Sequence, residues 1–505
     1  MCGIFISNNP LVNSESLTII EDCLRFRGPD SSSGLVAHTE WHAYHSRLSI
    51  IDINSGVNQP VIDDNGGILV FNGEILNYKE LGLKYFDCDY ISDSKLLSDL
   101  LASNQMSPNE LDGFFAFVYV DNHGQLKNAC RDRFGVKPLF YHQDGEYISF
   151  SSEPKVFKEL FNLSVNTDAV EEYYATRSPI FSHSFFTKVN SVEPGHCLVN
   201  GKYFDCKNYL TGNYESVTGE NLEACIKKGI TTRLVSDAPV GLLLSRGIDS
   251  NLMKELGEFN RYYTIGFDGD EDIEYLKSNP IKGLNIVECR TKEYAESFEY
   301  LLKLRGEPMS VPNEVLLYRV STVAAKDGIK VLLSGEGADE FFGGYDRIFN
   351  WAAKANNFDL NIFLNLYCYK PPKKNSKLYK QFTNLFATTD LKSVFEMVRW
   401  FFIRYHMPVL FRRLDFALMA AGIEGREPIA NHHVFAFAAK LSSEELMGGN
   451  LGKIPLRKVI EKYLGTKFAF EKKVGFPVDL TKVFNNPDNL SSYDLWFQEN
   501  LKVLK

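Results

Sequence analysis

Cys2 stands directly behind the start methionine and is followed by a glycine. A free cysteine is most often a small, buried hydrophobic residue. At position 2, however, removal of Met1 would give one residue both a thiol and a free α-amino group. Because an α-amino group has a reference pKa of about 7.7–8.0, it can act as a general base near neutral pH. The sequence therefore offers a nucleophile and its base on Cys2 alone.

Two glycine-containing loops follow strongly apolar runs in the second half of the chain. They read LLLSRGIDS at 242–250 and LLSGEGADEFFGGY at 332–345. At the start of a helix, such loops can surround phosphate oxygens with backbone N–H groups and short hydroxyls. Taken alone, the first loop is more often a strand followed by an ordinary helix cap.

The composition limits what kind of molecule carries these residues. At 505 residues, with 44% hydrophobic and 24% charged residues, the chain can form two or three globular domains. Its net charge of −9 and pI near 5.7 give no general attraction to polyanions. Nucleic acid and an anionic membrane surface are therefore not expected as main partners.

The cysteine pattern and the lack of targeting signals indicate a cytoplasmic protein. The start shows no signal-peptide pattern, and the most apolar later stretch, VRWFFIRYHMPVLF, is interrupted by Arg404, His406 and Pro408. The cysteines are odd in number and lack zinc-ligand spacing, which indicates a reducing compartment. They are Cys2, Cys23, Cys88, Cys130, Cys197, Cys206, Cys225, Cys289 and Cys368.

Two kinds of strand pattern must position these groups. Up to about residue 200, short apolar or alternating runs such as FFAFVYVDN are separated by turn sequences such as DDNGG, which predicts packed antiparallel sheets. After about residue 217, near-continuous apolar runs such as GIKVLLS alternate with helical patterns, which predicts a parallel α/β sheet. Ligands of such sheets bind beyond the carboxyl ends of the strands.

The first half resembles the glutaminase domain of class II, N-terminal-nucleophile glutamine amidotransferases. The resemblance rests on Cys2 and six ordered blocks, which read RFRGPDSSSG, HSRLSIID, VFNGEILNY, ISDSKLL, LDGFFAFVYVD and ACRDRFGVKPLFY. It implies an α+β domain over residues 2–205, an antiparallel sheet sandwich flanked by helices. It also implies glutamine hydrolysis, in which the Asn72 side-chain amide and the Gly73 backbone N–H hold the tetrahedral oxyanion.

The resemblance also implies how glutamine is held. Arg47 corresponds to the anchor of the α-carboxylate, and Glu74 and Asp93 correspond to the partners of the α-ammonium. The implied glutamine-binding set is Arg47, Leu48, Ser49, Ile50, Ile51, Asn72, Gly73, Glu74 and Asp93.

The second half resembles asparagine synthetases, and its first loop resembles the pyrophosphate loop of ATP pyrophosphatases, usually SGGxDS. Further matching blocks are LFRRLDFALMAAGIEGREPIANHHVFAFA and KKVGFPVD. The resemblance implies an α/β domain over residues 217–505, with a parallel sheet like that of adenine nucleotide α-hydrolases. The implied ATP-binding residues are Leu243, Ser245, Gly247, Asp249, Ser250, Ile265, Ser334 and Gly335.

Four side chains have implied chemical roles in this half. Asp249 and Asp339 are the expected Mg²⁺ ligands, since hard cations that bridge phosphates prefer carboxylate oxygen. Glu336 corresponds to the acid that handles protons as ammonia attacks the acyl-adenylate. Lys473 corresponds to the lysine that neutralises charge on the leaving pyrophosphate.

Some residues depart from the family pattern. Arg246 replaces the second glycine of the loop, where a left-handed backbone would cost a non-glycine residue about 1–2 kcal/mol. Alternatively, its guanidinium could contact phosphate. Glu471 stands where arginine is common, and GREPIAN replaces the typical ARVPFLD near the acceptor region.

The predicted activity is glutamine-dependent amidation. Cys2 releases ammonia from glutamine, ATP and Mg²⁺ activate an acceptor carboxylate as an acyl-AMP, and ammonia converts it into a carboxamide. L-Aspartate is the expected acceptor, and the assembly that the resemblance allows is a homodimer.

Three alternatives remain open. The same chemistry could act on another carboxylate, such as a sugar uronic acid or a specialised-pathway intermediate. A ring-closing amide synthesis would need no ammonia, so the intact Cys2, Arg47, Asn72 and Asp93 argue against it. A non-catalytic scaffold that retains the fold is the alternative of a different class.

Overall fold

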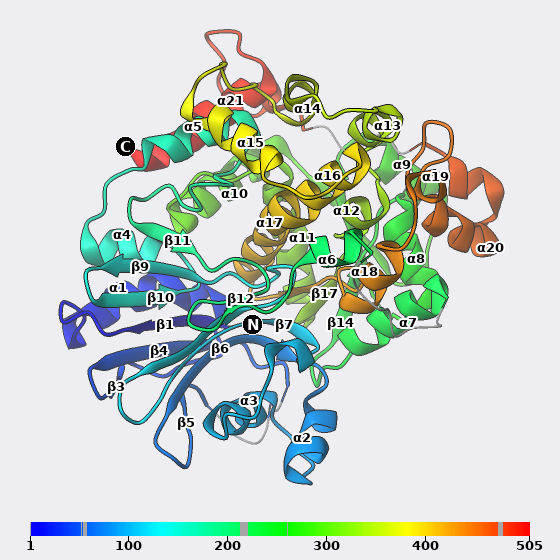
Figure 1. Cartoon of the computed structure of the whole chain (residues 1–505). Helices are drawn as coiled ribbons and strands as arrows, with labels where there is room; N and C mark the ends of the chain where they lie inside the picture. Colours follow the sequence, from blue (N-terminus) through cyan, green and yellow to red (C-terminus); the bar gives the residue numbers. More distant parts are fainter. Residues whose placement is uncertain (1, 52, 54–57, 213–220, 260, 473–477) are drawn as a thin grey trace.

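The computed structural model describes residues 2–51, 53, 58–212, 221–259, 261–472 and 478–505 (Figure 1). Antiparallel sheets form the first part of the chain and a parallel sheet forms the second, which confirms the predicted fold class. The division of the chain at 205 and 217 stays a prediction, because the segment that would connect the two domains includes residues outside those described.

Two antiparallel sheets make up the first part. The strand order of one sheet is β11-β9-β10-β1-β4-β2, with β3 beside β4, and that of the other is β13-β12-β8-β7-β6-β5. The first contains β1 (Gly3–Ser7), β2 (Ser31–Ser32), β3 (Val36–His38), β4 (Trp41–Arg47), β9 (Phe140–Asp144), β10 (Tyr147–Ser151) and β11 (Val189–Ser191). The second contains β5 (Val61–Ile62), β6 (Ile68–Ile75), β7 (Gly113–Val120), β8 (Leu126–Arg131), β12 (His196–Cys197) and β13 (Gly201–Lys202).

Strand β6 shows why the apolar runs are nearly continuous. Ile68 and Val70 face the other sheet and share a core with residues of β1 and β4. Leu69 and Phe71 point to the opposite face and pack under helices α2 (Tyr78–Phe86) and α3 (Asp93–Ala102). Because alternate side chains are buried on both faces, polar residues are scarce along the strand.

Helices cover the outer faces of both sheets. The outer face of the first sheet packs against α1 (Leu17–Leu24) and α4 (Lys155–Phe161). Helices α5 (Thr167–Thr176) and α6 (Cys206–Leu210) follow α4 along the chain.

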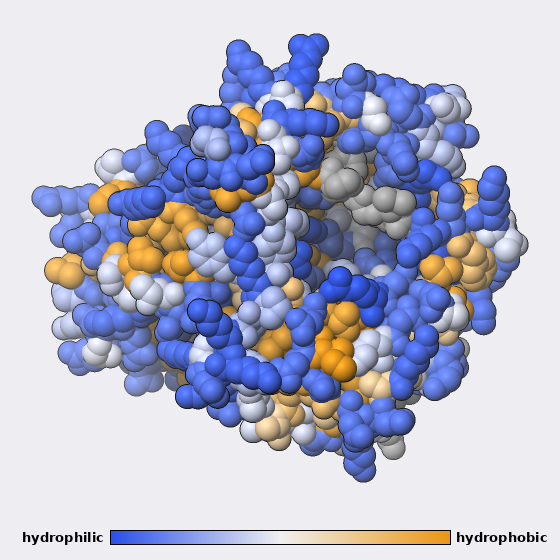
Figure 2. Space-filling view, turned by 90° about the horizontal axis from the view of Figure 1, so that it is seen from above, coloured by the Kyte–Doolittle hydropathy of each residue, from blue (hydrophilic) through white to orange (hydrophobic). Residues whose placement is uncertain are grey.

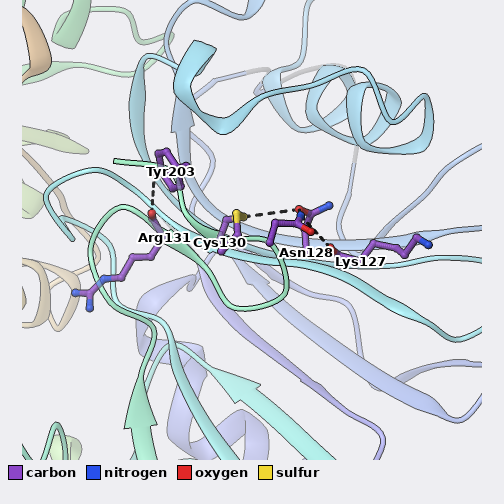
Figure 3. Close-up of a disulfide and its surroundings, with 7 residues drawn as sticks. Lys127, Asn128, Cys130, Arg131 and Tyr203 are labelled. Carbon is purple, nitrogen blue, oxygen red and sulfur yellow. Dashed lines mark hydrogen bonds between the residues drawn. A yellow bond between two sulfur atoms is a disulfide. The ribbon is translucent and has the colours of Figure 1, made fainter. Parts of the chain in front are cut away.

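Cys130 of β8 and Cys197 of β12 stand opposite each other in register and form a disulfide (Figure 3). Both residues are buried. Beside them, the Tyr203 hydroxyl donates to the Arg131 carbonyl oxygen at 2.7 Å. The scattered cysteine positions did not predict this pair, because sequence spacing does not show which strands become neighbours.

The parallel sheet has the order β16-β15-β14-β17-β18. Its strands are β14 (Val240–Leu243), β15 (Tyr262–Phe267), β16 (Leu284–Cys289), β17 (Val331–Leu333) and β18 (Glu424–Arg426). The helices nearest in sequence to these strands are α7 (Leu222–Arg233), α8 (Ile248–Leu256), α9 (Glu271–Ser278), α10 (Thr291–Arg305), α11 (Asn313–Lys326), α12 (Ala338–Phe342), α17 (Met407–Met419) and α18 (His432–Ala438).

A helical segment precedes β18, and three more α-helices follow α18 in the described part of the chain. The helices before α17 are α13 (Asp346–Lys354), α14 (Leu360–Tyr367), α15 (Lys377–Ala387) and α16 (Val394–Phe401), and a π-helical turn, Phe402–His406, joins α16 to α17. The last helices are α19 (Ser443–Leu446), α20 (Ile454–Phe470) and α21 (Ser492–Leu501).

The face drawn in Figure 2 is mostly hydrophilic, with hydrophobic residues gathered in separate patches. Within the described ranges, no helix combines the length and the apolar character that crossing a bilayer requires.

Candidate active sites

Cys2 lies at the start of β1, beside the end of β4, because Gly3 pairs with Ser46 in register. Its side chain is buried. Burial raises the pKa of the thiol, and a backbone hydrogen bond from Leu48 opposes part of that rise. The thiol is therefore held protonated, so its attack on a substrate requires a base.

Asn72 and Gly73 of β6 lie against Cys2. The Cys2 backbone N–H donates to Asn72 Oδ1 at 2.9 Å. The Nδ2 atom of Asn72 is buried and has no hydrogen-bond partner among the described residues. Gly73 has a φ of 140°, and a Cβ atom there would clash with the Phe114 carbonyl oxygen, so the position requires glycine. A buried amide donor is thus available beside the thiol for an oxyanion.

Glu74 of β6 and Asp93 at the start of α3 form a buried acidic pair. Asp93 Oδ2 accepts the backbone N–H of Ile75 at 3.0 Å. Burial raises the pKa of Asp93 to about 6, and burial together with the charge of Asp93 raises the pKa of Glu74. Because two close carboxylates repel each other, a cation such as an α-ammonium would stabilise their ionised forms.

Arg47 ends β4, and the predicted backbone segment follows it. The Arg47 guanidinium donates to Asn58 Oδ1 at 3.3 Å and to the Ile51 carbonyl oxygen at 3.5 Å. The Ser49 N–H donates to Asp30 Oδ2 at 2.8 Å. Two further members of the predicted set are buried, namely Leu48 and Ile50. The structure therefore brings the predicted glutamine-site residues to the strand ends around Cys2.

The loops of the parallel sheet meet at the carboxyl ends of β14 and β17. The Ser245 N–H donates to the Ser250 hydroxyl at 3.1 Å, and the Gly247 N–H donates to the Ser245 hydroxyl at 3.1 Å. A Cβ atom on Gly335, after β17, would lie 2.8 Å from the Asp249 Cβ atom. Because β14 and β17 are parallel neighbours, the two loops form one site at the edge where ligands bind.

A buried lysine that the sequence did not single out joins Asp249 and Asp339. The Lys453 ammonium lies 2.8 Å from Asp249 Oδ2 and 2.7 Å from Asp339 Oδ1. Burial lowers the pKa of Lys453, but the two carboxylates raise it by more. Lys453 has a φ of 61° and follows the glycine-rich segment 448–452. A lysine behind clustered glycines is the sequence signal that could have found it.

The two aspartates fit a magnesium site. The Oδ1 atom of Asp249 is buried without a hydrogen-bond partner in the described part of the chain. Mg²⁺ is usually held by one or two protein carboxylates together with substrate phosphates and water. Asp249 and Asp339 supply the two carboxylates of that donor set.

A cavity of about 290 Å³ opens at these loops. Side chains of Leu316 and Val320 from α11 add an apolar wall that sequence reasoning missed. The predicted ATP-site residues that line the cavity are Leu243, Ser245, Asp249, Ser250, Ile265, Ser334 and Gly335. Gly247 lines an adjoining cavity of about 340 Å³, together with Lys453 and Arg457. The first cavity suits a nucleoside, and the second suits its phosphates.

Glu336 stands in the nucleotide cavity and forms an ion pair with Arg413 of α17. Arg413 was not among the predicted residues. Lys473 lies outside the described residues, and its predicted role is untested.

Arg246 of the phosphate loop pairs with Glu471, the other charged residue that departs from the family pattern. Arg246 lies 2.6 Å from Glu471, and its guanidinium stacks 4.7 Å from the centre of the Tyr275 ring. Arg246 is not among the residues with positive φ, so the left-handed strain that was one of the two alternatives for this position does not arise. The sequence left the Arg246 guanidinium free to contact phosphate. In the structure it is paired with Glu471 instead.

Strand β18 runs from one candidate site toward the other. Arg426 Nε lies 2.5 Å from Glu424, and Arg426 Nη2 lies 3.9 Å from Glu74 of the acidic pair. Glu427 directly follows Arg426, at the carboxyl end of the strand. Burial raises the pKa of Glu427 to about 8, and the charge of Glu336 contributes to that rise. The short strand therefore links the surroundings of the two sites.

Comparison with known proteins agrees with this arrangement. Residues 221–497 match the family model described as asparagine synthase, and residues 1–210 match that of a glutamine amidotransferase domain. Asparagine synthetase (glutamine-hydrolyzing) 1 of Bacillus subtilis is 25% identical over 565 residues, covering 97% of this chain and 89% of that protein.

Two further relatives show the breadth of the similarity. Asparagine synthetase (glutamine-hydrolyzing) 3 of Bacillus subtilis is 26% identical, with 94% of this chain and 87% of that protein covered. Amidase chry2 of Gibberella zeae is 28% identical over 68% of this chain and 60% of its own length. The chain belongs to the asparagine synthase family and carries a glutamine amidotransferase domain in front of the synthase domain.

Proposed function

We propose that this chain is a glutamine-dependent, ATP-driven synthetase that converts an acceptor carboxylate into a carboxamide. The observation that carries the proposal is the presence of both half-sites on one chain, linked by β18. One half-site holds a thiol beside an amide Nδ2 atom that has no hydrogen-bond partner among the described residues. The other holds two aspartates, joined by Lys453, beside a nucleotide-sized cavity.

The glutaminase step uses the groups around Cys2. The Cys2 sulfur attacks the side-chain carbonyl carbon of glutamine, and the α-amine freed by loss of Met1 takes the thiol proton. The Asn72 Nδ2 and the Gly73 N–H stabilise the oxyanion of the tetrahedral intermediate. The α-amine passes the thiol proton to the amide nitrogen, and the C–N bond breaks to release ammonia and leave a thioester. Water then hydrolyses the thioester to glutamate and restores the thiol.

Arg47, Glu74 and Asp93 orient the substrate in this step. The Arg47 guanidinium binds the α-carboxylate, and the acidic pair binds the α-ammonium. These opposite charges align the side-chain amide of glutamine with Cys2.

The synthetase step takes place at the second cavity. The acceptor carboxylate attacks the α-phosphorus of ATP, forming an acyl-AMP and releasing pyrophosphate. Mg²⁺ held by Asp249 and Asp339 would neutralise negative charge on the phosphates. Lys453, and Lys473 by family resemblance, add positive charge, and Glu336 takes a proton from the ammonia that displaces AMP.

L-Aspartate is the first acceptor to test, because relatives of this chain are named asparagine synthetases. Another relative is named an amidase, so membership of the family does not by itself determine the acceptor. A cytoplasmic location and a homodimer remain proposals, drawn from the sequence pattern and the family resemblance.

ATP–pyrophosphate exchange across a panel of carboxylates, headed by L-aspartate, tests the proposal. We expect exchange that depends on an acceptor and on Mg²⁺. Absence of exchange with every carboxylate, while ATP still binds, would favour a non-catalytic scaffold.

A further inference from the structure

A cavity of about 420 Å³ adjoins the nucleotide site and has no part in the steps above. It shares Arg413 with the nucleotide cavity of about 290 Å³, and it shares Asp346 with the adjoining cavity of about 340 Å³ that suits the phosphates. In the proposed reaction, an acceptor must place its carboxylate where the α-phosphate and Glu336 meet. A space that borders both the nucleotide and the phosphates is suitably placed for the body of that acceptor.

The wall of this cavity carries excess positive charge. Arg177 comes from the C-terminal end of α5, in the glutaminase half, and makes no ion pair with a described residue. Arg347 donates to backbone carbonyls and likewise has no carboxylate partner in the described part of the chain. Arg413 is paired with Glu336, and Asp346 is the carboxylate in the wall. The cavity therefore suits an anionic molecule.

Arg177 is the C-cap residue of α5, and its charge has no ion-pair partner among the described residues. Its φ is 64°, which is uncommon for a residue with a side chain. Helices often end on a left-handed residue, so this conformation marks the end of α5. The fold thus holds a cation from one half of the chain against a cavity in the other.

One side of the cavity is aromatic. Two of its rings, Phe402 and His406, come from the π-helical turn between α16 and α17. Insertions of this kind within helices are frequent at functional sites. Tyr345 packs on Phe402 with ring centres 4.8 Å apart, and Tyr367 packs on His406 at 5.7 Å. These faces offer flat apolar surface to a ring-shaped ligand.

Hydrogen bonds fix His406 within this wall. His406 Nε2 lies 3.3 Å from the Tyr345 hydroxyl, and Nδ1 lies 3.2 Å from the Tyr367 hydroxyl. The Tyr345 hydroxyl donates to Glu340, so its oxygen can accept a hydrogen bond from Nε2–H of His406. Burial, with the charges of Arg177 and Arg413, lowers the pKa of His406 to about 3. His406 is therefore neutral, and the positive charge available to a ligand is that of the arginines.

We propose that this cavity binds the acceptor and selects a carboxylic acid that carries a ring and a second anionic group, which Arg177 binds. The inference rests on the proposed function and names its substrate class. L-Aspartate has two anionic groups but no ring, whereas a cavity of this size is typical of sites for drug-sized ligands.

Binding is measured by calorimetry on the full-length enzyme with α,β-methylene-ATP and Mg²⁺ present. Four probes separate the features of the acceptor: L-aspartate has no ring, and glucuronate has a ring but one anion. Glucuronate 1-phosphate has a saturated ring with two anions, and isophthalate has an aromatic ring with two. We expect at least one of the ring dianions to bind about tenfold or more tightly than L-aspartate and glucuronate.

Arg177→Gln should remove the advantage of the ring dianion over glucuronate, a loss of about tenfold to a hundredfold in affinity. Arg25→Gln, at an exposed arginine outside this cavity, is the matched control and should change nothing. Both variants should hydrolyse glutamine at the wild-type rate, which shows that they are folded.

Tightest binding of L-aspartate, or equal binding of the ring dianions to wild type and R177Q, would overturn the inference. ATP–pyrophosphate exchange is then run with the same probes. A ring dianion that binds through Arg177 but supports no exchange would preserve the pocket and contradict the proposed function, so the two failures are distinguishable.

Discussion

At the scale of single residues, the acidic pair beside Cys2 makes glutamine use sensitive to pH. Burial raises the pKa of Asp93 to about 6, and the ionised carboxylate is the form that binds an α-ammonium. We therefore expect the KM for glutamine to rise as the pH falls through about 6, with a smaller change in kcat. Glutamate release between about pH 5 and 8 measures both constants.

The same shift has a predictable sign for stability. A carboxyl whose pKa is raised in the folded state destabilises the fold above that pKa. This penalty disappears as the pH falls from about 6 toward the pKa of the carboxyl in the unfolded chain.

Asp93→Asn should abolish the pH-dependent rise in the KM for glutamine while weakening glutamine binding at every pH. A KM that stays flat through pH 6 in the wild type would contradict the role given to Asp93.

At the scale of elements, β6 can hold its register only because residue 73 is glycine. Gly73→Ala places a Cβ atom against the Phe114 carbonyl oxygen of β7, so the strands must separate where Asn72 faces Cys2. We expect loss of glutaminase activity and a lower melting temperature, both measured on the purified variant.

Gly66→Ala is the matched control for this substitution. Gly66 also has positive φ, but a Cβ atom there would have ordinary contact at 3.4 Å. Gly66→Ala should lower the free energy of unfolding by about 1–2 kcal/mol through backbone strain alone. The variant should retain glutaminase activity. Equal damage from both variants would show that the clash at Gly73 is not decisive.

The phosphate loop gives a second prediction at this scale. Arg246 and Glu471 are partly exposed, so their ion pair should contribute only about 0–1 kcal/mol to stability. Glu471→Gln frees the guanidinium for the triphosphate and should lower the KM for ATP. Arg246→Gln leaves the Glu471 carboxylate facing the triphosphate and should raise the KM for ATP.

Initial rates of pyrophosphate release at varied ATP give these KM values, and the double variant measures the coupling. Changes in the same direction in both single variants would contradict the pairing. Melting temperatures should stay near that of the wild type in each case.

At the scale of the whole molecule, a buried ion-pair network joins the two halves. Arg27 of the first half lies 2.7 Å from Glu153 and 2.8 Å from Asp415 of α17. Arg27→Ala leaves both carboxylates buried without this cation, which should cost about 3–5 kcal/mol. Urea unfolding gives the cost, and the ratio of glutamate to AMP produced shows whether the halves become uncoupled.

Lys330→Ala is the control for this network. Lys330 also pairs across the halves, at 2.6 Å from Asp30, but both side chains are partly exposed. It should cost about 0–1 kcal/mol. A similar small cost for Arg27→Ala would show that the network does not hold the halves together.

Much of this arrangement could be predicted from local sequence. The apolar runs of β6, β14 and β17 indicate strands of buried sheets, because burial on both faces of a strand favours apolar residues along its length. Residues carried by the loops after these strands, such as Ser245 and Glu336, could be found from the same motifs.

Other features depend on distant parts of the chain and could not be predicted. Lys453 pairs with Asp249, although 204 positions separate the two residues in the sequence. Arg177 belongs to the glutaminase half but lines the cavity of about 420 Å³ beside the nucleotide site. The pairing of Arg246 with Glu471 is likewise visible only once α20 has packed against α8.

The central claim is that one site makes ammonia and another uses it. The most direct test compares wild type and Cys2→Ala in AMP release, with glutamine or with ammonium as the nitrogen donor and the acceptor found by exchange. Cys23→Ala, at another buried cysteine of the same half, is the control. We predict that Cys2→Ala loses glutamine-dependent amidation but keeps the ammonium-dependent rate, while the control keeps both. Loss of both activities in a folded Cys2→Ala protein, or retention of glutamine use, would contradict the account.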